Sequence, residues 1–358
     1  MESSKQMLAF DKMVQHFIQK IKVGKLSGSF QISTETVILL KKIIEDYQWK
    51  NAREIIHLIS QYGVVLSKQL ALESCVTNMV RRILKIIREE YSTCVQKKSQ
   101  EDDNYQESLH KLVVSSDDEA TDFANPTSDT SELRDSILDH ISELEMELDT
   151  CHDNVSSQAC EHIHSNEIIL TLGYSKIVEL FLKNAAQHRK FQCIVMENSP
   201  ENKGHELAVS LAKSKIQTVL IPDSAMFGLI SRVNKIIIGT HTVMANGGLR
   251  SVCGTHAVAL AAQHYSIPVI VLAPLYKLSP QFLCSYDQDT FNNFISPEKV
   301  LSYEHRDLVS KVQVFNPEYD YVPPELVSLF ISNTGGHAPS YIYRLLSELY
   351  HPDDSIHA

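Results

Sequence analysis

Apolar residues in the N-terminal quarter of the chain recur every three or four positions, which is the spacing of one face of an α-helix. Ser33 and Thr34 precede the clearest such segment and are good N-cap residues for it. No alternating strand pattern interrupts the region, so the sequence predicts an N-terminal α-helical domain over residues 1–96. The apolar faces of two of its helices are expected at Val37, Leu40, Ile43 and Ile44, and at Val76, Met79, Val80, Ile83 and Ile87.

The pattern changes twice before the middle of the chain. Residues 97–130 are acidic and polar with few large apolar side chains, so we expect a disordered insert that cannot offset its ordering entropy by burial. The helical period then returns, and residues 131–165 are predicted to form a long connecting helix. Its apolar face is expected at Ile137, Ile141, Leu144 and Leu148.

From residue 166 onward, short apolar runs alternate with helical patterns. The runs "EIILTLG", "FQCIVMEN", "IQTVLIPD", "NKIIIGT" and "IPVIVLAP" have the length and composition of buried strands, and helix-like segments follow the first four. This order is typical of a parallel sheet covered on both faces. The sequence therefore predicts an α/β protein, with the helical domain followed by a Rossmann-like parallel-sheet domain over residues 166–358.

The bulk composition excludes several classes of protein. Of the 358 residues, 43% are hydrophobic and 22% charged, as in ordinary globular proteins. No run of about 18 apolar residues and no apolar N-terminal region occur, so we expect neither a membrane-spanning helix nor a secretory signal. The seven cysteines form no CxxC pair, which disfavours disulfides and zinc and fits reduced thiols in the cytosol. A net charge of −11 disfavours direct binding to nucleic acid, and we expect no cofactor.

The stretch "MANGGLRSVCGTHAVALAAQHY" follows the fourth strand-like run and passes through paired glycines into a helix-like segment. Gly247 and Gly248 would let the backbone come close to a ligand, and the following helix would offer free N–H groups to an anion. The pattern is neither GxGxxG nor GxxxxGK[ST], so it specifies neither a dinucleotide site nor a P-loop. A tight turn with packing glycines is the alternative interpretation.

Two polar residues near the C-terminus are weighed in the same way. Asp320 in "DYVPPELVSLF" is expected to be a cap or structural partner rather than an acid catalyst. His337 in "TGGHAP" is expected to be an ordinary loop residue, with a place facing the ligand pocket as the alternative.

At this point the chain shows a resemblance to a known family. The stretch "IIIGTHTVMANGGLRSVCGTHAVALAAQHYSIPVIVLAPLYKLSPQF" resembles the regulatory subunits of eukaryotic translation initiation factor 2B. The beta branch of that family is favoured by "EHIHSNEIILTLGYSKIVELFLKNAA", "APLYKLSPQF" and "FNPEYDYVPPELVSLFISNTGGHAPSYIYRLLSELYHPDD". The similarity is dense from Glu161 to Asp354 and weaker in the helical third.

The same superfamily includes isomerases of methylthioribose-1-phosphate and ribose-1,5-bisphosphate, so the resemblance implies an ancestral sugar-phosphate pocket. Gly173 stands where those isomerases carry a reactive Cys, and His241 stands at the position of their Asp. A glycine is neither a nucleophile nor an acid, so we expect a vestigial pocket without catalytic residues. An active isomerase and a non-catalytic sugar-phosphate sensor are the alternative functions. The pocket residues are expected to be Gly173, His241, Asn246, Gly247, Gly248, Gly254 and Thr255.

The resemblance also implies a subunit interface beside the entry to the first strand. His164, Asn166 and Gln192 are its candidate residues, and Gln192 replaces the His expected in related beta subunits. A strand-entry turn that is satisfied within the chain is the equal alternative.

The function implied is regulatory. The resembled assembly exchanges guanine nucleotide on initiation factor 2, with catalysis in its gamma and epsilon subunits. Alpha, beta and delta subunits form a core that binds the alpha subunit of factor 2 and senses its phosphorylation, which requires different affinities for two states. These subunits and factor 2 are the expected partners, in the cytosol. Arg81, Arg82 and Lys85, expected on an exposed helix face, are either a contact with factor 2 or an ordinary solvated surface.

Overall fold

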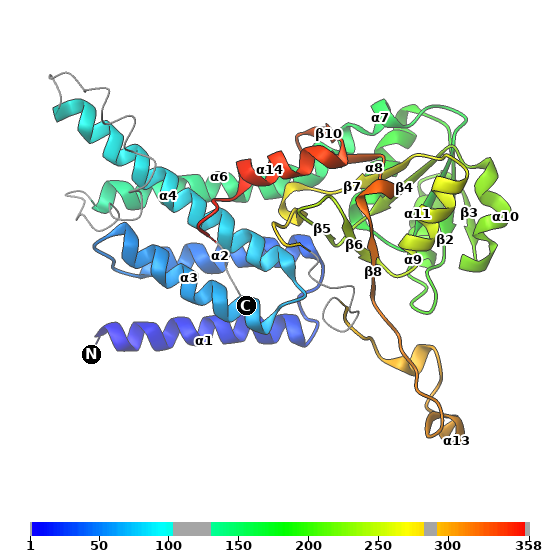
Figure 1. Cartoon of the computed structure of the whole chain (residues 1–358), viewed down its shortest axis with the longest axis horizontal. Coiled ribbons are helices and arrows are strands. Elements are labelled where there is room, and N and C mark those ends of the chain that lie inside the picture. Colours follow the sequence, from blue (N-terminus) through cyan, green and yellow to red (C-terminus); the bar gives the residue numbers. More distant parts are fainter. Residues whose placement is uncertain (1, 103–129, 283–291, 355–358) are drawn as a thin grey trace. The chain divides into compact units, whose positions relative to one another are not determined.

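The computed structural model describes residues 2–102, 130–282 and 292–354 (Figure 1). The chain divides into two compact units. The helical unit comprises Met1–Leu148 and Ser347–Ala358, and the sheet unit comprises Asp149–Leu346. This division differs from the predicted boundaries, because the first part of the connecting helix and the C-terminal end of the chain both belong to the helical unit.

The helical unit is built from long helices whose apolar faces are buried together. Every residue expected on the two N-terminal apolar faces is buried, as predicted. Ser33 and Thr34, however, are not caps: they lie inside a helix and donate to the carbonyls of Ser29 and Phe30, because the helix begins one turn earlier, after Gly28. The helices are α1 (Glu2–Lys22), α2 (Ser29–Asp46), α3 (Ala52–Gln69) and α4 (Ser74–Asp102).

The expected exposed basic face of α4 is wrong. Arg81 is only 6% exposed. Arg82 forms an ion pair of 2.7 Å with Glu147, and Lys85 donates to the carbonyl of Glu348. The aliphatic stems of these side chains lie beside the buried stripe of the helix, and their charged ends find partners within the same unit. This face is therefore internal rather than solvated.

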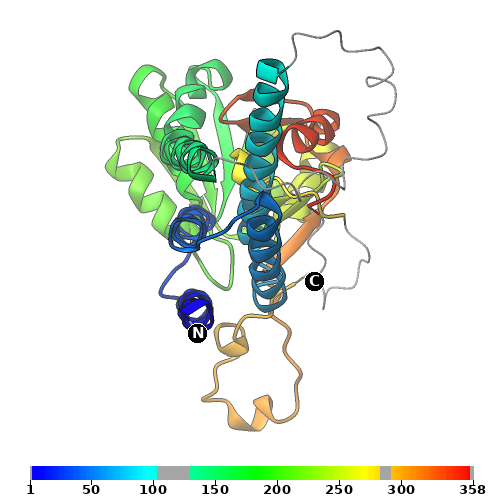
Figure 2. The same ribbon diagram turned by 90° about the vertical axis from the view of Figure 1, so that its left-hand side faces the viewer.

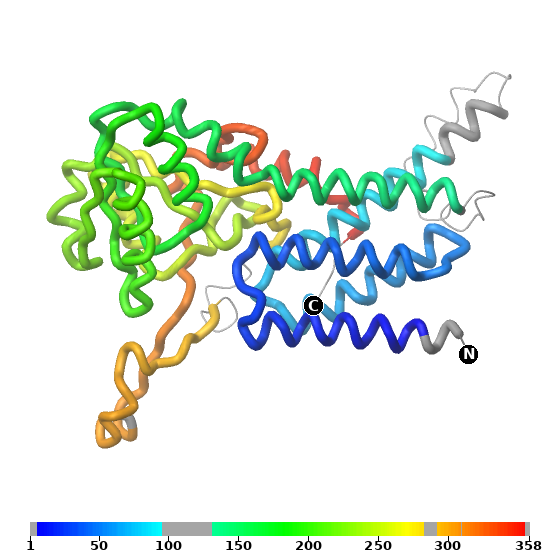
Figure 3. The backbone as a smooth tube through the Cα atoms, turned by 180° about the vertical axis from the view of Figure 1, so that it is seen from behind, coloured from blue at the N-terminus to red at the C-terminus, as the bar shows by residue number. Residues whose placement is uncertain are grey.

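One long helix, α6 (Thr130–Ser157), follows, and Figure 3 traces it as a continuous rod. Its predicted apolar face is buried throughout. The expected helix over residues 131–165 ends earlier than predicted, and a short helix α7 (Ala159–His162) continues the chain. The expected insert begins later than residue 97, since α4 extends to Asp102; the rest of it, residues 103–129, lies outside the described residues.

The sheet unit contains a seven-stranded sheet in the order β10-β9-β7-β4-β1-β2-β3. All neighbouring pairs are parallel except β9 and β10. If β10 is left out, the order of the strands in the sheet is that of a doubly wound nucleotide-binding fold. The topological switch point of this sheet lies between β1 and β4. The strands are β1 (Ile168–Leu172), β2 (Gln192–Met196), β3 (Gln217–Ile221), β4 (Lys235–Gly239), β7 (Val269–Leu272), β9 (Leu329–Ser332) and β10 (Gly335–His337).

The predicted Rossmann-like core is confirmed. The five predicted runs form its strands β1, β2, β3, β4 and β7. Helices α8 (Lys176–His188) and α9 (Gly204–Lys213) pack against alternate residues of the strands, with Phe181 fully buried at the centre. Burial of each such large side chain contributes about 1.5–3 kcal/mol. This unit also contains α10 (Met226–Leu229), α11 (Thr255–His264) and α13 (Arg306–Val309). Helix α14 (Ile342–Leu349) begins in this unit, and its last three residues belong to the helical unit.

A small antiparallel sheet that the sequence did not predict comprises β5 (Thr242–Val243), β6 (Leu249–Val252) and β8 (Tyr319–Val322). The paired glycines lie in the turn between β5 and β6, so their expected place at the entry to a helix is wrong. Before β8, residues 292–318 extend away from the sheet as an arm (Figures 1 and 2), with Phe315 63% exposed at its return. Among the described helices, none has the length and apolar character needed to cross a membrane.

Candidate functional site

The switch point of the sheet places Gly173 and Gly239 at the carboxyl ends of β1 and β4. Gly173 has φ +61°, and its N–H donates to the carbonyl of Met196 at 3.2 Å. A Cβ at this position would lie 3.3 Å from the side-chain oxygen of Asn198. A side chain at this position would be strained and crowded, so glycine suits it.

The other side of the switch point is filled by serine side chains. A Cβ on Gly239 would lie 2.4 Å from Oγ of Ser175, and Ser251 Oγ donates to the Gly239 carbonyl at 3.1 Å. The two hydroxyls therefore pack against Gly239 at the carboxyl end of β4, the end of the strands at which ligands of doubly wound folds bind. Lys277, which is 8% exposed, donates to the carbonyl of the next residue, Thr240, at 2.7 Å.

His241 is held by the small antiparallel sheet. Its ring lies 4.8 Å from the ring of Tyr319, and its Nδ1 lies 3.2 Å from Nη2 of Arg250. Because a guanidinium can only donate, Nδ1 must be the acceptor, which places the proton of a neutral ring on Nε2. The contacts of His241 thus lie on the small sheet, whereas Gly173 contacts β2 and Asn198. The structure therefore gives Gly173 and His241 different neighbours.

Asn246, Gly247 and Gly248 form a hairpin turn that packs on the chain itself. Asn246 accepts from the Gly248 N–H at 2.9 Å and donates to the Tyr321 hydroxyl at 2.9 Å. Gly247 has φ +81°, and a Cβ there would lie 3.0 Å from the carbonyl oxygen of Pro339. The glycines therefore form a tight turn between β5 and β6.

The N-terminus of α11 is occupied by a carboxylate of the chain. Gly254, at φ +97°, precedes the helix, and its N–H donates to Oδ2 of Asp320 at 2.6 Å. The N–H of His256 lies 3.3 Å from the same oxygen. Thr255 is buried and donates to the carbonyl of Val252. The expectation that Asp320 is a cap is confirmed, and the helix end that would attract a phosphate already holds a negative charge.

A second carboxylate closes the neighbouring loop. Asp223 accepts from the N–H groups of Asn198 at 3.0 Å and Ser199 at 2.7 Å. Asn198 also donates to the carbonyl of Cys253 at 3.0 Å. Sequence reasoning missed Asn198 and Asp223; the available signal was that each is a polar residue shortly after a predicted strand, where ligands of such folds bind.

Cys253 is the one thiol within this group of residues. Burial, the charge of Asp320 with its hydrogen bond, and the charge of Asp223 raise the pKa of Cys253 to about 11, although a hydrogen bond from Gly254 opposes the shift. The thiol is therefore protonated near neutral pH and is a poor nucleophile. In the part of the chain that the structure describes, no group of three His, Cys, Asp or Glu side chains could hold a metal ion.

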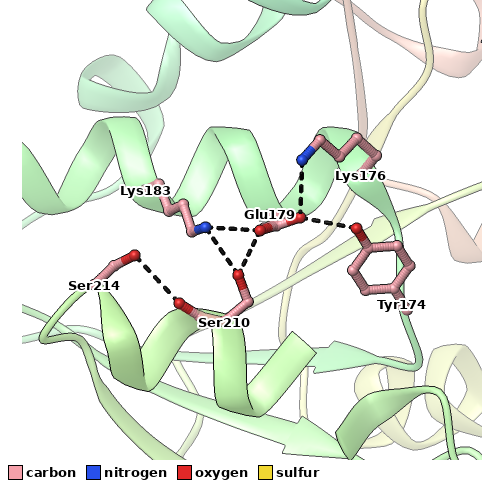
Figure 4. A network of polar contacts seen from close by, with 6 residues as sticks. All are labelled: Tyr174, Lys176, Glu179, Lys183, Ser210 and Ser214. Carbon is pink, nitrogen blue, oxygen red and sulfur yellow. Dashed lines mark hydrogen bonds and ion pairs between the residues drawn. The ribbon is translucent and has the colours of Figure 1, made fainter. Parts of the chain in front are cut away.

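Beside this site, Glu179 joins α8 to α9 through a buried polar network (Figure 4). Its carboxylate accepts from Lys183 at 2.7 Å, Ser210 at 2.5 Å and Tyr174 at 2.9 Å. Burial would raise the pKa of Glu179, but these hydrogen bonds and the charge of Lys176 lower it to about 2. Because Tyr174 directly follows Gly173, the network fixes the backbone of the strand end at the switch point.

The expected interface residues lie together at the opposite edge of the sheet. His164, Asn166 and Gln192 flank the amino ends of β1 and β2, and the N–H of Asn166 donates to the Lys190 carbonyl at 2.7 Å. The N–H groups of His164 and Gln192 donate to the side chain and carbonyl of Glu167. The backbone of the turn is thus satisfied locally. The side chains of His164 and Asn166 are exposed, and Gln192 is half-buried.

With this geometry in place, comparison with known proteins decides the family. The sequence profile of the initiation factor 2 subunit family matches residues 25–339. The chain belongs to that family. "Translation initiation factor eIF2B subunit beta" of Dictyostelium discoideum is 43% identical, over 94% of this chain and 95% of its own length. The protein of the same name from Schizosaccharomyces pombe is 34% identical, over 96% and 97%. The expected resemblance to the beta branch is confirmed.

Solved structures of this family agree with the fold. Crystalline eIF2B beta from Chaetomium thermophilum has a TM-score of 0.74 and 25% identity, over 96% of this chain and 94% of that chain. The tetrameric eIF2B beta2-delta2 complex of the same organism shows the same fold at a TM-score of 0.72 and 23% identity, over 97% of this chain and 98% of that chain. The 5-methylthioribose 1-phosphate isomerase of Pyrococcus horikoshii shows it at a TM-score of 0.58 and 19% identity, over 94% of this chain and 87% of that chain.

Proposed function

We propose that this chain is the beta-type regulatory subunit of the guanine-nucleotide exchange factor for translation initiation factor 2. The observation that carries the proposal is 43% identity, across nearly the whole length of both chains, to a protein named as eIF2B subunit beta. In this role the chain catalyses no reaction itself. It helps to build a cytosolic core that binds the alpha subunit of factor 2 and responds to its phosphorylation.

The geometry of the switch point supports a non-catalytic role. Gly173 offers no reactive side chain, Cys253 is protonated at neutral pH, and the carboxylate of Asp320 occupies the helix end suited to a phosphate. A sugar-phosphate isomerase would need a reactive pair and room for an anionic substrate. We therefore interpret the site as a relic of ligand binding whose N–H donors now serve the fold.

The proposed contact with a delta subunit is at the amino edge of β1 and β2. His164 and Asn166 present exposed side chains there, on a turn whose backbone is already satisfied. Side chains of this kind are suited to hydrogen bonds with a partner. Alpha, gamma and epsilon subunits complete the proposed assembly, without direct contact to nucleic acid or membrane.

The test is a pull-down of the tagged full-length chain at moderate salt, followed by a GDP-release assay on factor 2 with unphosphorylated and phosphorylated alpha subunit. We expect four other subunits to co-purify and the exchange rate to fall on phosphorylation. Recovery of the chain alone, without exchange activity, would contradict the proposal. The isomerase alternative predicts turnover of methylthioribose-1-phosphate or ribose-1,5-bisphosphate by the purified chain.

The interface is tested by His164→Glu together with Gln192→Glu. We expect lower recovery of the delta subunit with an unchanged melting temperature of the isolated chain. Lys213→Glu changes the charge by the same amount at an exposed position of α9, so it is the matched control and should leave recovery unchanged. Equal recovery with the double variant and the control would place the contact elsewhere.

A further inference from the structure

The last described residues of the chain are part of the helical unit, although they follow the sheet unit in sequence. The segment 347–354, which begins in the last turn of α14, buries Tyr350 to 6% and Asp354 to 5% exposure. Burial raises the pKa of the Tyr350 phenol, although the charges of Arg82 and Arg81 oppose this shift. A buried phenol and a buried carboxylate indicate that this segment packs at a specific place on the helical unit.

The segment packs against a row of cationic side chains on α4. Arg88 Nε donates to Oδ1 of Asp354 at 2.9 Å, and the two side chains are only 16% and 2% exposed. Arg81 Nε lies 3.3 Å from the backbone carbonyl of the same aspartate. Lys85 donates to the carbonyl of Glu348. The positions 81, 85 and 88 share one helical face, so one surface holds both ends of the segment.

We propose that Arg81, Lys85 and Arg88 form a peptide-binding site on α4 whose ligand is the chain's own segment 347–354. Because removing one partner of a buried ion pair leaves an uncompensated charge, the site is stable only when it is filled. The helical unit is then complete only after segment 347–354 has bound. The inference rests on contacts within the helical unit alone, so it does not depend on the proposed function.

The first test uses two full-length variants that differ by one position. Asp354→Asn removes the buried carboxylate charge, whereas Asp353→Asn removes a neighbouring carboxylate that is 66% exposed. We expect Asp354→Asn to lower the melting temperature by at least about 5 °C and to speed amide hydrogen exchange in α4. Asp353→Asn should behave as wild type. Equal behaviour of the two variants, or unchanged exchange in α4, would overturn the proposal.

The second test supplies the ligand in trans. A chain that ends at Leu346 should exchange α4 amides faster than wild type, and a synthetic peptide of residues 347–358 should bind it and restore protection. The same peptide with the Asp354→Asn change should bind at least about tenfold more weakly. A chain that lacks only residues 355–358 is the control and should not bind the peptide. Equal binding of both peptides, or no restored protection, would refute a specific site.

Discussion

The carboxylate of Asp320 accepts a hydrogen bond of 2.6 Å from the backbone N–H of Gly254, at the start of α11. The two residues are 66 positions apart, and the pairing of β6 with β8 brings them together, since Ser251 is in register with Asp320. A carboxylate at a helix N-terminus is favoured by the helix dipole. The same charge disfavours an anionic ligand at this helix end, so one contact both stabilises the fold and excludes anions from the N-terminus of α11.

We predict that Asp320→Asn lowers the free energy of unfolding of the sheet unit by about 1–2 kcal/mol. The amide keeps an acceptor but loses the charge that faces the helix end. Urea denaturation of the full-length chain, monitored by circular dichroism, measures the change. Asp307→Asn, on the exposed arm, is the control and should be neutral. A similar midpoint for both variants would show that the Asp320 charge does not stabilise α11.

The same substitution should make Cys253 more reactive. Burial and Asp320 raise the pKa of the Cys253 thiol, so its alkylation by iodoacetamide should accelerate only toward pH 11 in the wild type. Removing the Asp320 charge should move that acceleration to lower pH. Peptide mass spectrometry distinguishes Cys253 from the half-buried Cys94 and Cys160, which serve as internal references. An unchanged pH profile at Cys253 would show that Asp320 does not act on the thiol.

The parallel core could be predicted from the sequence because its strands are short apolar runs with helical patterns between them. The edge elements could not. Strand β10 consists of Gly335, Gly336 and His337, which carry no strand signal, and it forms only because β9 offers a free edge. Asn246-Gly247 is a strong hairpin signal. The strand before it, β5, has only two residues and shows no strand pattern in the sequence, so the pattern favours a helix entry instead.

The candidate site shows the same limit. The positions of Gly173 and His241 followed from a family resemblance, but which residues fill the space around them depends on contacts distant in sequence. Ser175 packs on Gly239 because β1 and β4 are neighbours in the sheet, and Asp320 reaches α11 through the small sheet. The basic residues of α4 were misplaced for a related reason. The charges of these residues led us to expect that they are exposed. Only the structure shows that Arg81 and Lys85 donate to backbone carbonyls of Asp354 and Glu348.

Gly247→Ala should destabilise the hairpin between β5 and β6. The residue has φ +81°, a conformation that costs an L-residue about 1–3 kcal/mol, and its new methyl would lie 3.0 Å from the Pro339 carbonyl oxygen. Gly228→Ala is the matched control, because its Cβ meets nothing within 4 Å and its helix α10 favours alanine. Thermal unfolding should separate the two variants. An unchanged melting temperature for Gly247→Ala would mean that the turn adapts at little cost.

Glu179 should make the stability of the sheet unit depend on acidic pH. Burial opposes ionisation of Glu179, yet the hydrogen bonds from Lys183, Ser210 and Tyr174 lower its pKa from 4.5 to about 2. A carboxylate with a lowered folded-state pKa stabilises the fold above its unfolded pKa, and this contribution is lost as pH falls from about 4.5 toward 2. At neutral pH this contribution amounts to roughly 2–3 kcal/mol.

The free energies of unfolding of wild type and Glu179→Gln, measured by urea denaturation, should therefore differ most at pH 7 and converge as the pH falls below 4. Glu161→Gln, an exposed carboxylate of the same unit, controls for loss of charge and should parallel the wild type across the range. A constant difference between wild type and Glu179→Gln from pH 7 to pH 3 would show that shape, rather than charge, gives Glu179 its role at the switch point.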